Sequence, residues 1–417
     1  MSHALSSFPL ADADKCVKCA LCLPHCPTYR LTLDEGESPR GRIALMQGMA
    51  SGALKVTPHF TAHLDHCLSC RACEAVCPAE VPYGRLIDAA RAEMRRQGSA
   101  EAWQARGFAF VMRSTQLRRL LHGSLWLAEA LYLIPLARRL HGLGSANLRR
   151  QLEMLPKVVF PHRRQTRYPA DTQKTDVLLF TGCIADITNP QTSTAAIQLL
   201  NALSVGVMVP AAQQCCGALD QHAGRAQKAA ESARQNLAAF SGDAVIVGTA
   251  SGCLATLKEY QEVRPGAEAK QFAARVQDIC SYVAGQAGLT KIAFKPWPVR
   301  AVLHAPCTLR NVLKTDKAVL PLLKLVPELQ VDVLPASTGC CGAAGSYVLT
   351  QAQEADAFAE QIVETMQKRA AAPELLITSN IGCALHLKAA LARRGIHIPV
   401  LHPIEVLARQ LPDATRH

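Results

Sequence analysis

The chain of 417 residues contains no run of about 18 uncharged apolar residues, so we expect no transmembrane helix. Its first residues, Met1 to Ala11, lack the basic segment and apolar run of a secretory signal, and we therefore expect a cytoplasmic protein. Aromatic residues make up only 5% of the chain, which disfavours a nucleic-acid-binding surface built on base stacking. Charged residues reach only 19% and hydrophobic residues 49%, a balance that excludes a mainly disordered chain.

A fingerprint for flavin or nicotinamide binding is also missing. The nearest match, Gly142 to Gly144, has no third glycine and does not follow a predicted strand. We therefore expect no flavin in this chain. Its length exceeds what one hydrophobic core usually serves, which predicts two to four domains.

Cysteine, by contrast, is abundant, with 17 residues. Cytosolic thiols are kept reduced, so this number favours metal ligation or redox chemistry over a disulfide framework. The spacing C-x2-C-x2-C-x3-C-P occurs twice, from Cys16 to Pro27 and from Cys67 to Pro78. In such runs the first three cysteines bind one [4Fe-4S] cluster and the fourth binds the other. The predicted ligands are Cys16, Cys19, Cys22 and Cys77 for one cluster, and Cys67, Cys70, Cys73 and Cys26 for the second.

A structural zinc site is the alternative for these cysteines, but it needs one set of four and leaves the second run unexplained. Between the two runs, Ser38 and Pro39 are typical of an N-cap and a first helical residue, and they predict a helix over 40–49. We expect a helical ferredoxin domain whose two clusters conduct electrons. Three arginines near the cysteines are expected to form surface salt bridges, with an effect on cluster potential as the alternative: Arg40, Arg42 and Arg71.

The rest of the chain contains two similar halves. An apolar run ending in Cys183, a Cys-Cys-Gly sequence and a later cysteine recur in the same order at offsets of 124, 125 and 130 residues. Three matched landmarks indicate a duplicated domain. The first half is predicted to contain strands at 177–180, 205–209 and 244–247, separated by helices at 192–203 and 225–240.

This βαβαβ order predicts a parallel sheet in each half, with the cysteines at the carboxyl edge of the strands. A glycine after each cysteine pair can adopt a positive φ and turn both sulfurs toward one pocket. A further cluster, another metal or a redox thiol pair all stay open for these pockets, so the chain holds two to four clusters. The candidate redox or metal thiols are Cys183, Cys215, Cys216 and Cys253 in the first half, and Cys307, Cys340, Cys341 and Cys383 in the second.

Three further residues, one cysteine and two histidines, have possible roles near these thiols. Cys280 stands alone and is expected to be a small buried side chain. His304 and His386 are candidates for metal ligands or proton shuttles near the second set, against the ordinary alternative of a histidine with satisfied hydrogen bonds.

Positive charge is concentrated in one region. Residues 91–170 hold fourteen arginines and one lysine against four glutamates, which is nearly the whole net charge of +12. Such a block indicates an anionic partner surface. Within it, a helix over 120–140 with an apolar centre over 125–136 is predicted; twelve residues rise about 18 Å, too short for a bilayer core of about 30 Å. This helix is expected to lie on a membrane surface, on a partner, or on its own protein.

We therefore predict a multidomain α+β protein, in which a helical dicluster ferredoxin domain precedes two duplicated α/β cysteine-rich domains. The predicted boundaries are 1–90 for the ferredoxin-type domain, 91–170 for a basic helical connector, 171–290 for the first cysteine-rich domain and 291–417 for the second.

Two ferredoxin motifs followed by two Cys-Cys-Gly domains resemble the iron-sulfur subunits of bacterial glycolate oxidase, over nearly the whole chain. That family is related to heterodisulfide reductase subunits and to the small subunit of anaerobic glycerol-3-phosphate dehydrogenase. In the reductases the pattern ends in C-x2-C, whereas here Ala250 and Asn380 stand three residues before Cys253 and Cys383. This reduced ending is shared by the glycolate oxidase subunits and favours them.

The resemblance implies that separate FAD-containing subunits oxidise glycolate, with D-lactate as a second candidate substrate. This chain would pass electrons from the flavin toward a quinone, from a peripheral position on the inner face of the bacterial inner membrane. An alternative is the equivalent subunit of another flavin dehydrogenase, such as one for glycerol-3-phosphate, or a disulfide-reducing partner. An iron-sulfur nucleic-acid-binding protein would use the arginines for phosphates, but they are not interleaved with aromatic residues, so we expect no nucleic-acid partner.

Overall fold

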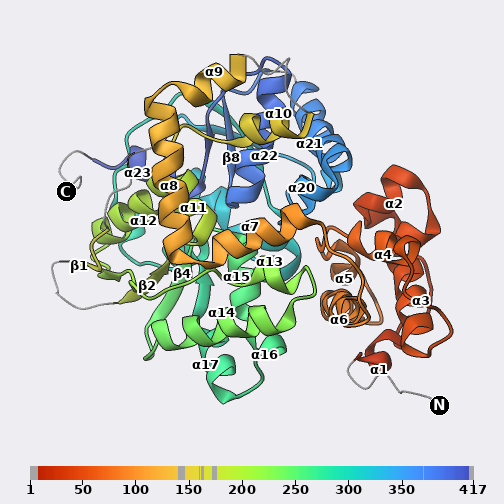
Figure 1. Ribbon diagram of the computed structural model, residues 1–417. Coiled ribbons are helices and arrows are strands. Elements are labelled where there is room, and N and C mark those ends of the chain that lie inside the picture. The colour runs from red at the N-terminus through yellow and green to blue at the C-terminus, as the bar shows by residue number, and fades with distance from the viewer. Residues whose placement is uncertain are drawn as a thin grey trace.

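A computed structural model describes residues 8–139, 146–158, 160, 164–170, 176–369 and 371–412. A helical domain lies at one end of the molecule, and two α/β units lie beside each other at the other end (Figure 1). The predicted fold class, a helical ferredoxin domain followed by two duplicated α/β domains, is confirmed. The domain boundaries at 90, 170 and 290 stay predictions.

Short helices build the N-terminal domain around an apolar core to which α3 and α6 contribute Met46, Leu86 and Met94. The predicted N-cap is confirmed, since the backbone N–H of Gly41 donates to Ser38 Oγ at 2.9 Å. The elements are α1 (Leu10–Ala13), α2 (Pro27–Thr32), α3 (Pro39–Ala50), α4 (Pro58–Asp65), α5 (Ala72–Ala75) and α6 (Tyr83–Arg96), with single turns at Leu23–His25 and Glu35–Glu37.

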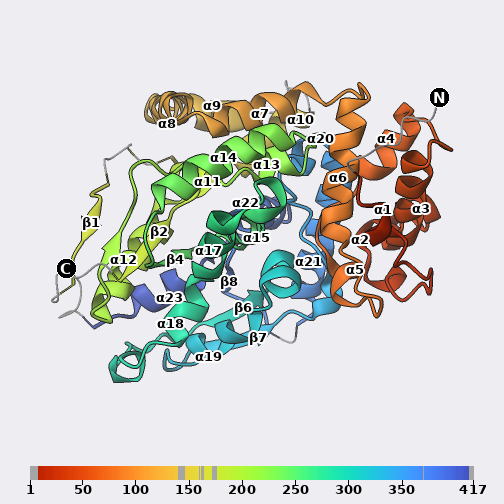
Figure 2. The same ribbon diagram turned by 90° about the horizontal axis from the view of Figure 1, so that it is seen from below.

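Within the described residues, helices α7 to α10 lie in the basic connector, and α7 to α9 run along one outer edge of the molecule (Figure 2). The prediction of one continuous helix over 120–140 was wrong. The helix stops after Ala130 because Tyr132 adopts a left-handed conformation with φ of +57°, and a new helix starts at Leu133. The elements are α7 (Trp103–Arg113), α8 (Thr115–Ala130), α9 (Leu133–Arg139) and α10 (Ala146–Met154). Leu140 and the segment from Gly142 to Gly144 lie outside the described residues.

The first α/β unit contains the three predicted strands at the expected places, as β2, β3 and β4. Its sheet has the order β1-β3-β2-β4-β5 and is parallel except for the short edge strand β1. Its strands are β1 (Arg167–Tyr168), β2 (Val177–Phe180), β3 (Val207–Met208), β4 (Val245–Gly248) and β5 (Val276–Asp278). Its helices are α11 (Cys183–Thr188), α12 (Pro190–Ala202), α13 (Ala218–Gln221), α14 (Ala226–Ala239), α15 (Ser251–Lys258), α16 (Tyr260–Val263), α17 (Ala267–Arg275) and α18 (Ile279–Ala284).

The second unit repeats this plan with a fully parallel sheet in the order β7-β6-β8-β9. Its strands are β6 (Arg300–His304), β7 (Gln330–Val333), β8 (Leu375–Thr378) and β9 (Val400–Leu401). Its helices are α19 (Val319–Leu323), α20 (Tyr347–Thr350), α21 (Ala352–Gln367), α22 (Ile381–Arg393) and α23 (Pro403–Arg409), with single turns at Leu289–Lys291, Leu309–Leu313, Asp316–Ala318 and Ala336–Thr338.

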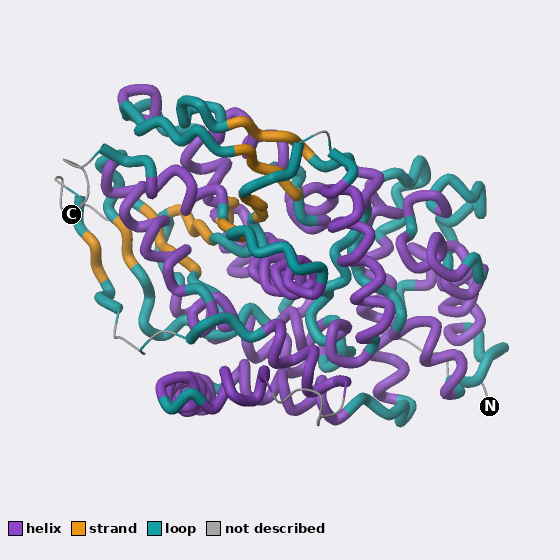
Figure 3. The backbone as a smooth tube through the Cα atoms, turned by 90° about the horizontal axis from the view of Figure 1, so that it is seen from above, coloured by secondary structure: helices purple, strands orange, loops and turns teal. Residues whose placement is uncertain are grey.

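The two units share one apolar core, because α12 of the first packs against α23 of the second. Leu199 and Leu200 of α12 and Leu407 of α23 are fully buried in it. Figure 3 shows both sheets enclosed by helices. Across the unit boundary, the backbone N–H of Ser251 donates to the carbonyl oxygen of Ser379 at 3.3 Å. The carboxyl edges of the two sheets are therefore held close together, and with them the cysteines that follow the strands.

Candidate iron-sulfur sites

The two ferredoxin motifs have the same backbone conformation at two equivalent positions. Lys18 and Ala20 adopt φ of +56° and +70° in the first motif, and the equivalent Ser69 and Arg71 adopt +49° and +57° in the second. Residues with a side chain disfavour this left-handed conformation by about 1 to 2 kcal/mol. Its recurrence at the same two positions indicates that both loops are shaped for one purpose, since such strain persists mainly at functional sites.

A first cavity lies under the first loop. Its walls include Cys16, Cys19 and Cys22 together with Cys77 from the other motif. Cys19 is exposed, and burial raises the pKa of the Cys22 thiol to about 11. A buried thiol of this kind becomes a thiolate only beside a cation such as a bound metal.

A second cavity lies under the second loop. It is lined by Cys67, Cys70 and Cys73 together with Cys26 from the first motif, and Cys73 also borders the first cavity. Burial raises the pKa of Cys70 and Cys73 above the ordinary value. The two cavities are therefore neighbours, and each is lined by three cysteines of one motif and the fourth of the other. This arrangement supports the crossed ligation, which stays a prediction.

The arrangement fits a cluster better than a single metal ion. Within the part of the chain that the structure describes, no group of three or more His, Cys, Asp or Glu side chains has the geometry of a site for a single metal ion. A cluster is larger than an ion and is held by thiolates spread around a cavity. The eight ferredoxin cysteines have that distribution, which disfavours the zinc alternative.

The first four-thiol pocket lies at the carboxyl edge of the first sheet, where the sequence predicted it. Cys183 opens α11 directly after β2, and its thiol donates to Cys215 Sγ at 3.5 Å. This hydrogen bond lowers the pKa of Cys215, while the pKa values of Cys183 and Cys216 are raised by the thiols beside them and by burial. Cys253 interacts with Cys216 on the far side of the set, so the four thiols form one chain of contacts.

The second pocket repeats this pattern. The Sγ atoms of Cys307 and Cys340 are 3.9 Å apart, and Cys341 donates to Cys383 Sγ at 2.8 Å. The hydrogen bond from Cys307 lowers the pKa of Cys340. Asn380, at the position where the reductase pattern has a cysteine, donates through Nδ2 to Cys383 Sγ at 3.4 Å. Each half thus gathers its four predicted thiols.

Polar side chains hold the backbone of both cysteine pairs. In the first half, Asn236 Nδ2 donates to the carbonyl oxygen of Cys215 at 3.0 Å, and the Tyr260 hydroxyl donates to that of Cys216 at 3.0 Å. In the second half, His386 Nδ1 donates to the carbonyl oxygen of Cys341 at 2.8 Å. His386 Nε2 also lies 3.4 Å from Asp356 Oδ1, so both of its nitrogens have protein partners.

His304 differs from His386. Its Nδ1 lies 3.0 Å from Thr378 Oγ1, but its Nε2 has no hydrogen-bond partner among the described residues. Burial lowers the pKa of His304 to about 4, so the ring is neutral at physiological pH. Cys280 is fully buried in the shared core and lies apart from the four-thiol sets, as expected of a small core side chain.

The two pockets differ in their neighbours. Cys340 of the second pocket packs in one apolar cluster with Cys70 of the second cavity, and Asn311 Nδ2 donates to the carbonyl oxygen of Cys70 at 2.8 Å. The first pocket instead shares its core with Ala109 and Met112 of α7. The second pocket therefore adjoins the ferredoxin domain directly, and the first lies beneath the basic connector.

Of the three arginines expected in surface salt bridges, Arg40 forms one with Glu35 at 2.6 Å, and its side chain is about one third exposed. Arg71 is partly buried and pairs with Glu74 and, across the domain interface, with Glu259. For Arg42 the expectation was wrong, because its side chain is buried in the wall of the second cavity. A helix position four residues after the N-cap Ser38 gave no sign of this burial.

Comparison with known proteins agrees with this geometry. A family model described as a 4Fe-4S dicluster domain matches residues 12–81, and one described as a cysteine-rich domain matches residues 177–258 and 301–388. The glycolate oxidase iron-sulfur subunit of Escherichia coli (strain K12) is 31% identical over 95% of this chain and 93% of its own length. The chain belongs to the family of glycolate oxidase iron-sulfur subunits. A second member, the probable glycolate oxidase iron-sulfur subunit of Bacillus subtilis (strain 168), is 32% identical over 91% of this chain and 89% of its own length.

A shorter relative also covers part of the chain. Lactate utilization protein A of Macrococcus caseolyticus (strain JCSC5402) is 26% identical over 57% of this chain and 98% of its own length. The family membership supports [4Fe-4S] clusters in the ferredoxin domain of this subunit. Sequence reasoning named Arg42 but missed four other side chains near the cysteines, namely Thr28, Tyr83, Asn236 and Tyr260. They come from elements far apart in the chain, so no local pattern marks them.

Proposed function

We propose that this chain is the electron-transfer subunit of a flavin-dependent dehydrogenase complex that oxidises glycolate. The observation that carries the proposal is the pair of adjacent cysteine-lined cavities, with a four-thiol pocket packed against the second. Clusters bound there would supply one-electron conduction, which a flavin reduced by a hydride needs in order to be reoxidised. FAD-containing subunits on separate chains would perform the oxidation itself.

The protein's own residues would serve this role in two ways. The crossed cysteine sets would hold the clusters as neighbours, with the exposed Cys19 at the end that faces solvent and a partner. The interface between Cys70 and Cys340 would keep water out of the passage toward the second pocket, because this apolar cluster also contains the buried side chains of Leu68 and Phe358.

We also propose that the chain is peripheral on the inner face of the membrane and works with a quinone. No helix within the described ranges has the length and apolar character needed to cross a bilayer. Large apolar side chains are nevertheless exposed on α7, α8, α9 and the turn between α8 and α9, and Arg106 and Arg119 are exposed beside them. This combination suits the surface of an anionic membrane. The exposed apolar residues are Trp103, Phe110, Leu120, Leu127, Leu131, Tyr132, Leu133 and Leu136.

Lactate is the second candidate substrate, favoured by the similarity to lactate utilization protein A. The complex of this chain with its flavin subunits should be assayed with glycolate, D-lactate and glycerol-3-phosphate, following reduction of a quinone analogue. Fast turnover with glycolate supports the proposal. An inactive glycolate reaction beside fast turnover of another of these substrates would reject glycolate as the substrate while leaving the electron-transfer role intact.

A further inference from the structure

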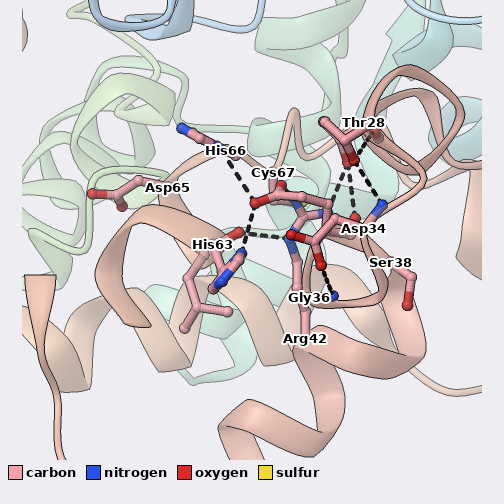
Figure 4. Close-up of polar contacts among 12 residues, drawn as sticks. Thr28, Asp34, Gly36, Ser38, Arg42, His63, Asp65, His66 and Cys67 are labelled. Atoms are coloured by element: carbon pink, nitrogen blue, oxygen red, sulfur yellow. Dashed lines mark hydrogen bonds and ion pairs between the residues drawn. The ribbon is translucent and has the colours of Figure 1, made fainter. Parts of the chain in front are cut away.

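Two arginines, Arg42 and Arg71, line the second cavity, and Arg42 is the more deeply buried. Arg42 on α3 is only 1% exposed, and its side chain lines the cavity together with Thr28. The guanidinium donates from Nε to the carbonyl oxygen of His63 at 2.7 Å and from Nη1 to Thr28 Oγ1 at 2.9 Å. Nη2 pairs with the Glu37 carboxylate. Figure 4 shows Arg42 among Thr28, His63 and Cys67.

Thr28 connects this cation to a cysteine. Its Oγ1 lies 3.3 Å from Cys26 Sγ and donates to the carbonyl oxygen of Glu37 at 3.0 Å. A hydroxyl has one proton and two acceptor positions, and Arg42 occupies one of the acceptor positions. As a cluster ligand Cys26 is a thiolate and can only accept, so the Thr28 hydroxyl would turn its one proton from the carbonyl oxygen of Glu37 to the Cys26 sulfur. Arg42, Thr28 and Cys26 thus form a charge-assisted chain of hydrogen bonds.

The charge of Arg42 is directed at the cavity. Its negative partner, Glu37, also binds the imidazoles of His63 and His66, with Oε1 at 2.7 Å and 3.2 Å from their Nδ1 atoms. The negative charge is therefore divided among three partners, and of these four residues it is Arg42 that lines the cavity. Because the guanidinium is buried, solvent ions screen it little. A second hydroxyl, that of Tyr83, reaches Cys67 Sγ at 3.7 Å.

The first cavity lacks the threonine hydroxyl and the buried arginine, although Tyr83 lines both cavities. The motifs align Cys26-Pro27-Thr28 with Cys77-Pro78-Ala79, and Ala79, which has no hydroxyl, lines the first cavity. The cations in that wall are Lys18, which is exposed, and Arg40, whose partly exposed side chain is paired with Glu35. The two motifs have the same cysteine spacing, but different side chains line their cavities.

We propose that Arg42 and Thr28 are positioning residues that raise the reduction potential of the site formed by Cys67, Cys70, Cys73 and Cys26. Reduction adds one negative charge, which a buried cation and hydrogen bonds to the sulfurs stabilise. The inference rests on the proposed function, since it requires both sites to hold clusters. The two motifs share one cysteine spacing, which by itself gives no reason for their reduction potentials to differ. Arg42 and Thr28 would provide that difference.

The test is a redox titration of the full chain, purified without oxygen and followed by electron paramagnetic resonance, with iron and sulfide measured on each sample. Arg42→Gln is expected to lower one midpoint potential, Thr28→Val to lower the same one by less, and Arg42→Lys, which keeps the charge, to lower it by less than Arg42→Gln. The matched control Arg40→Gln is expected to leave that potential unchanged. Ala79→Thr, which adds a hydroxyl at the equivalent position, is expected to raise the other potential.

The proposal is overturned when Thr28→Val and Arg42→Gln keep wild-type iron and sulfide and leave both potentials unchanged, or shift both equally. Arg42→Gln removes a buried ion pair and is therefore the variant at risk of misfolding. Should it lose its iron, Thr28→Val and Ala79→Thr decide the matter, because both variants keep Arg42 and Glu37. Opposite shifts on different clusters support the proposal, and no shift in either variant rejects it. Wild-type protein without iron and sulfide would instead reject the proposed function.

Discussion

The glycines after the two cysteine pairs show how a duplicated motif keeps its conformation while its surroundings change. Gly217 and Gly342 adopt φ of +90° and +81°, as expected for residues that turn two adjacent thiols into one pocket. A Cβ added at Gly342 would lie 2.5 Å from the carbonyl oxygen of Ala355, whereas at Gly217 the nearest atom would be 3.3 Å away. The backbone at Gly342 is thus packed more tightly against its neighbours than the backbone at Gly217.

Gly342→Ala is therefore expected to destabilise the protein more than Gly217→Ala. A side chain at positive φ costs about 1 to 2 kcal/mol, and the clash at 342 adds to this, for a total of about 3 kcal/mol or more. Gly395→Ala is the control, because φ there is +69° and no atom lies within 4 Å of an added Cβ. Urea unfolding under argon measures the three losses. Equal losses for all three variants would show that the contact with Ala355 is relieved without cost.

The two pockets are tested separately by Cys216→Ser and Cys341→Ser. If the four thiols of a pocket act together, each variant is expected to lower the quinone reductase activity of the complex at least about tenfold, because one member of the buried set is lost. Cys280→Ser is the matched control, since this thiol lies in the core away from both sets. Unchanged activity and iron content in both pocket variants would mean that the pockets have no redox or metal role.

Among the elements, α6 joins the ferredoxin domain to the first α/β unit. Asp88 on α6 lies 2.9 Å from His222, which follows α13, and Arg91 donates to the carbonyl oxygen of His222 at 3.1 Å. Burial alone would lower the pKa of His222, but the Asp88 carboxylate outweighs it, and the pKa is raised above its ordinary value. Folding therefore favours the protonated imidazole.

This contact predicts a pH dependence of stability. A raised histidine pKa contributes stability fully below the unfolded value of about 6.5 and loses it as pH rises through the folded value. His222 is partly exposed, so the contribution is about 0.5 kcal/mol. Between pH 6 and pH 9, His222→Gln and Asp88→Asn are expected to lose less unfolding free energy in urea than the wild type. A loss as large as that of the wild type in both variants would contradict the role of this pair.

The exposed apolar side chains on helices α7 to α9 predict that the protein binds to anionic vesicles. Replacing both Leu131 and Leu133 by Glu is expected to weaken sedimentation with phosphatidylglycerol vesicles at least about tenfold, because it adds charge repulsion and removes apolar contact. Leu31→Glu, on the exposed side of α2, is the control and should bind as the wild type does. If wild-type protein does not bind such vesicles at low salt, this face serves another partner and the membrane proposal fails.

The accuracy of the predicted helix and strand boundaries also differs between elements. The strand at 177–180 was predicted to the residue, because an apolar run between turn signals leaves little choice. The break at Leu131 and Tyr132 was missed, since an apolar pattern continues across it and a left-handed residue has no marker there. The edge strand β1 was also missed, because two residues are too few to form a pattern.

For the whole molecule, the cysteine spacing predicted which thiols meet, and the structure gathers each predicted set. It did not predict that the second pocket, rather than the first, adjoins the ferredoxin domain. That order depends on contacts between distant segments, such as Asn311 with Cys70 and Arg30 with the carbonyl oxygen of Ser337. The spacing of cysteines predicts the conformation of a local loop. The docking of two domains depends instead on surfaces that form only after each domain has folded.

The central claim is that the eight cysteines of the ferredoxin domain hold two [4Fe-4S] clusters. Its most direct test is the content of iron, acid-labile sulfide and zinc per chain in protein purified without oxygen. The account predicts brown protein with about eight irons and eight sulfides, or more if the four-thiol pockets are also loaded. Colourless protein that carries zinc and no sulfide would contradict it.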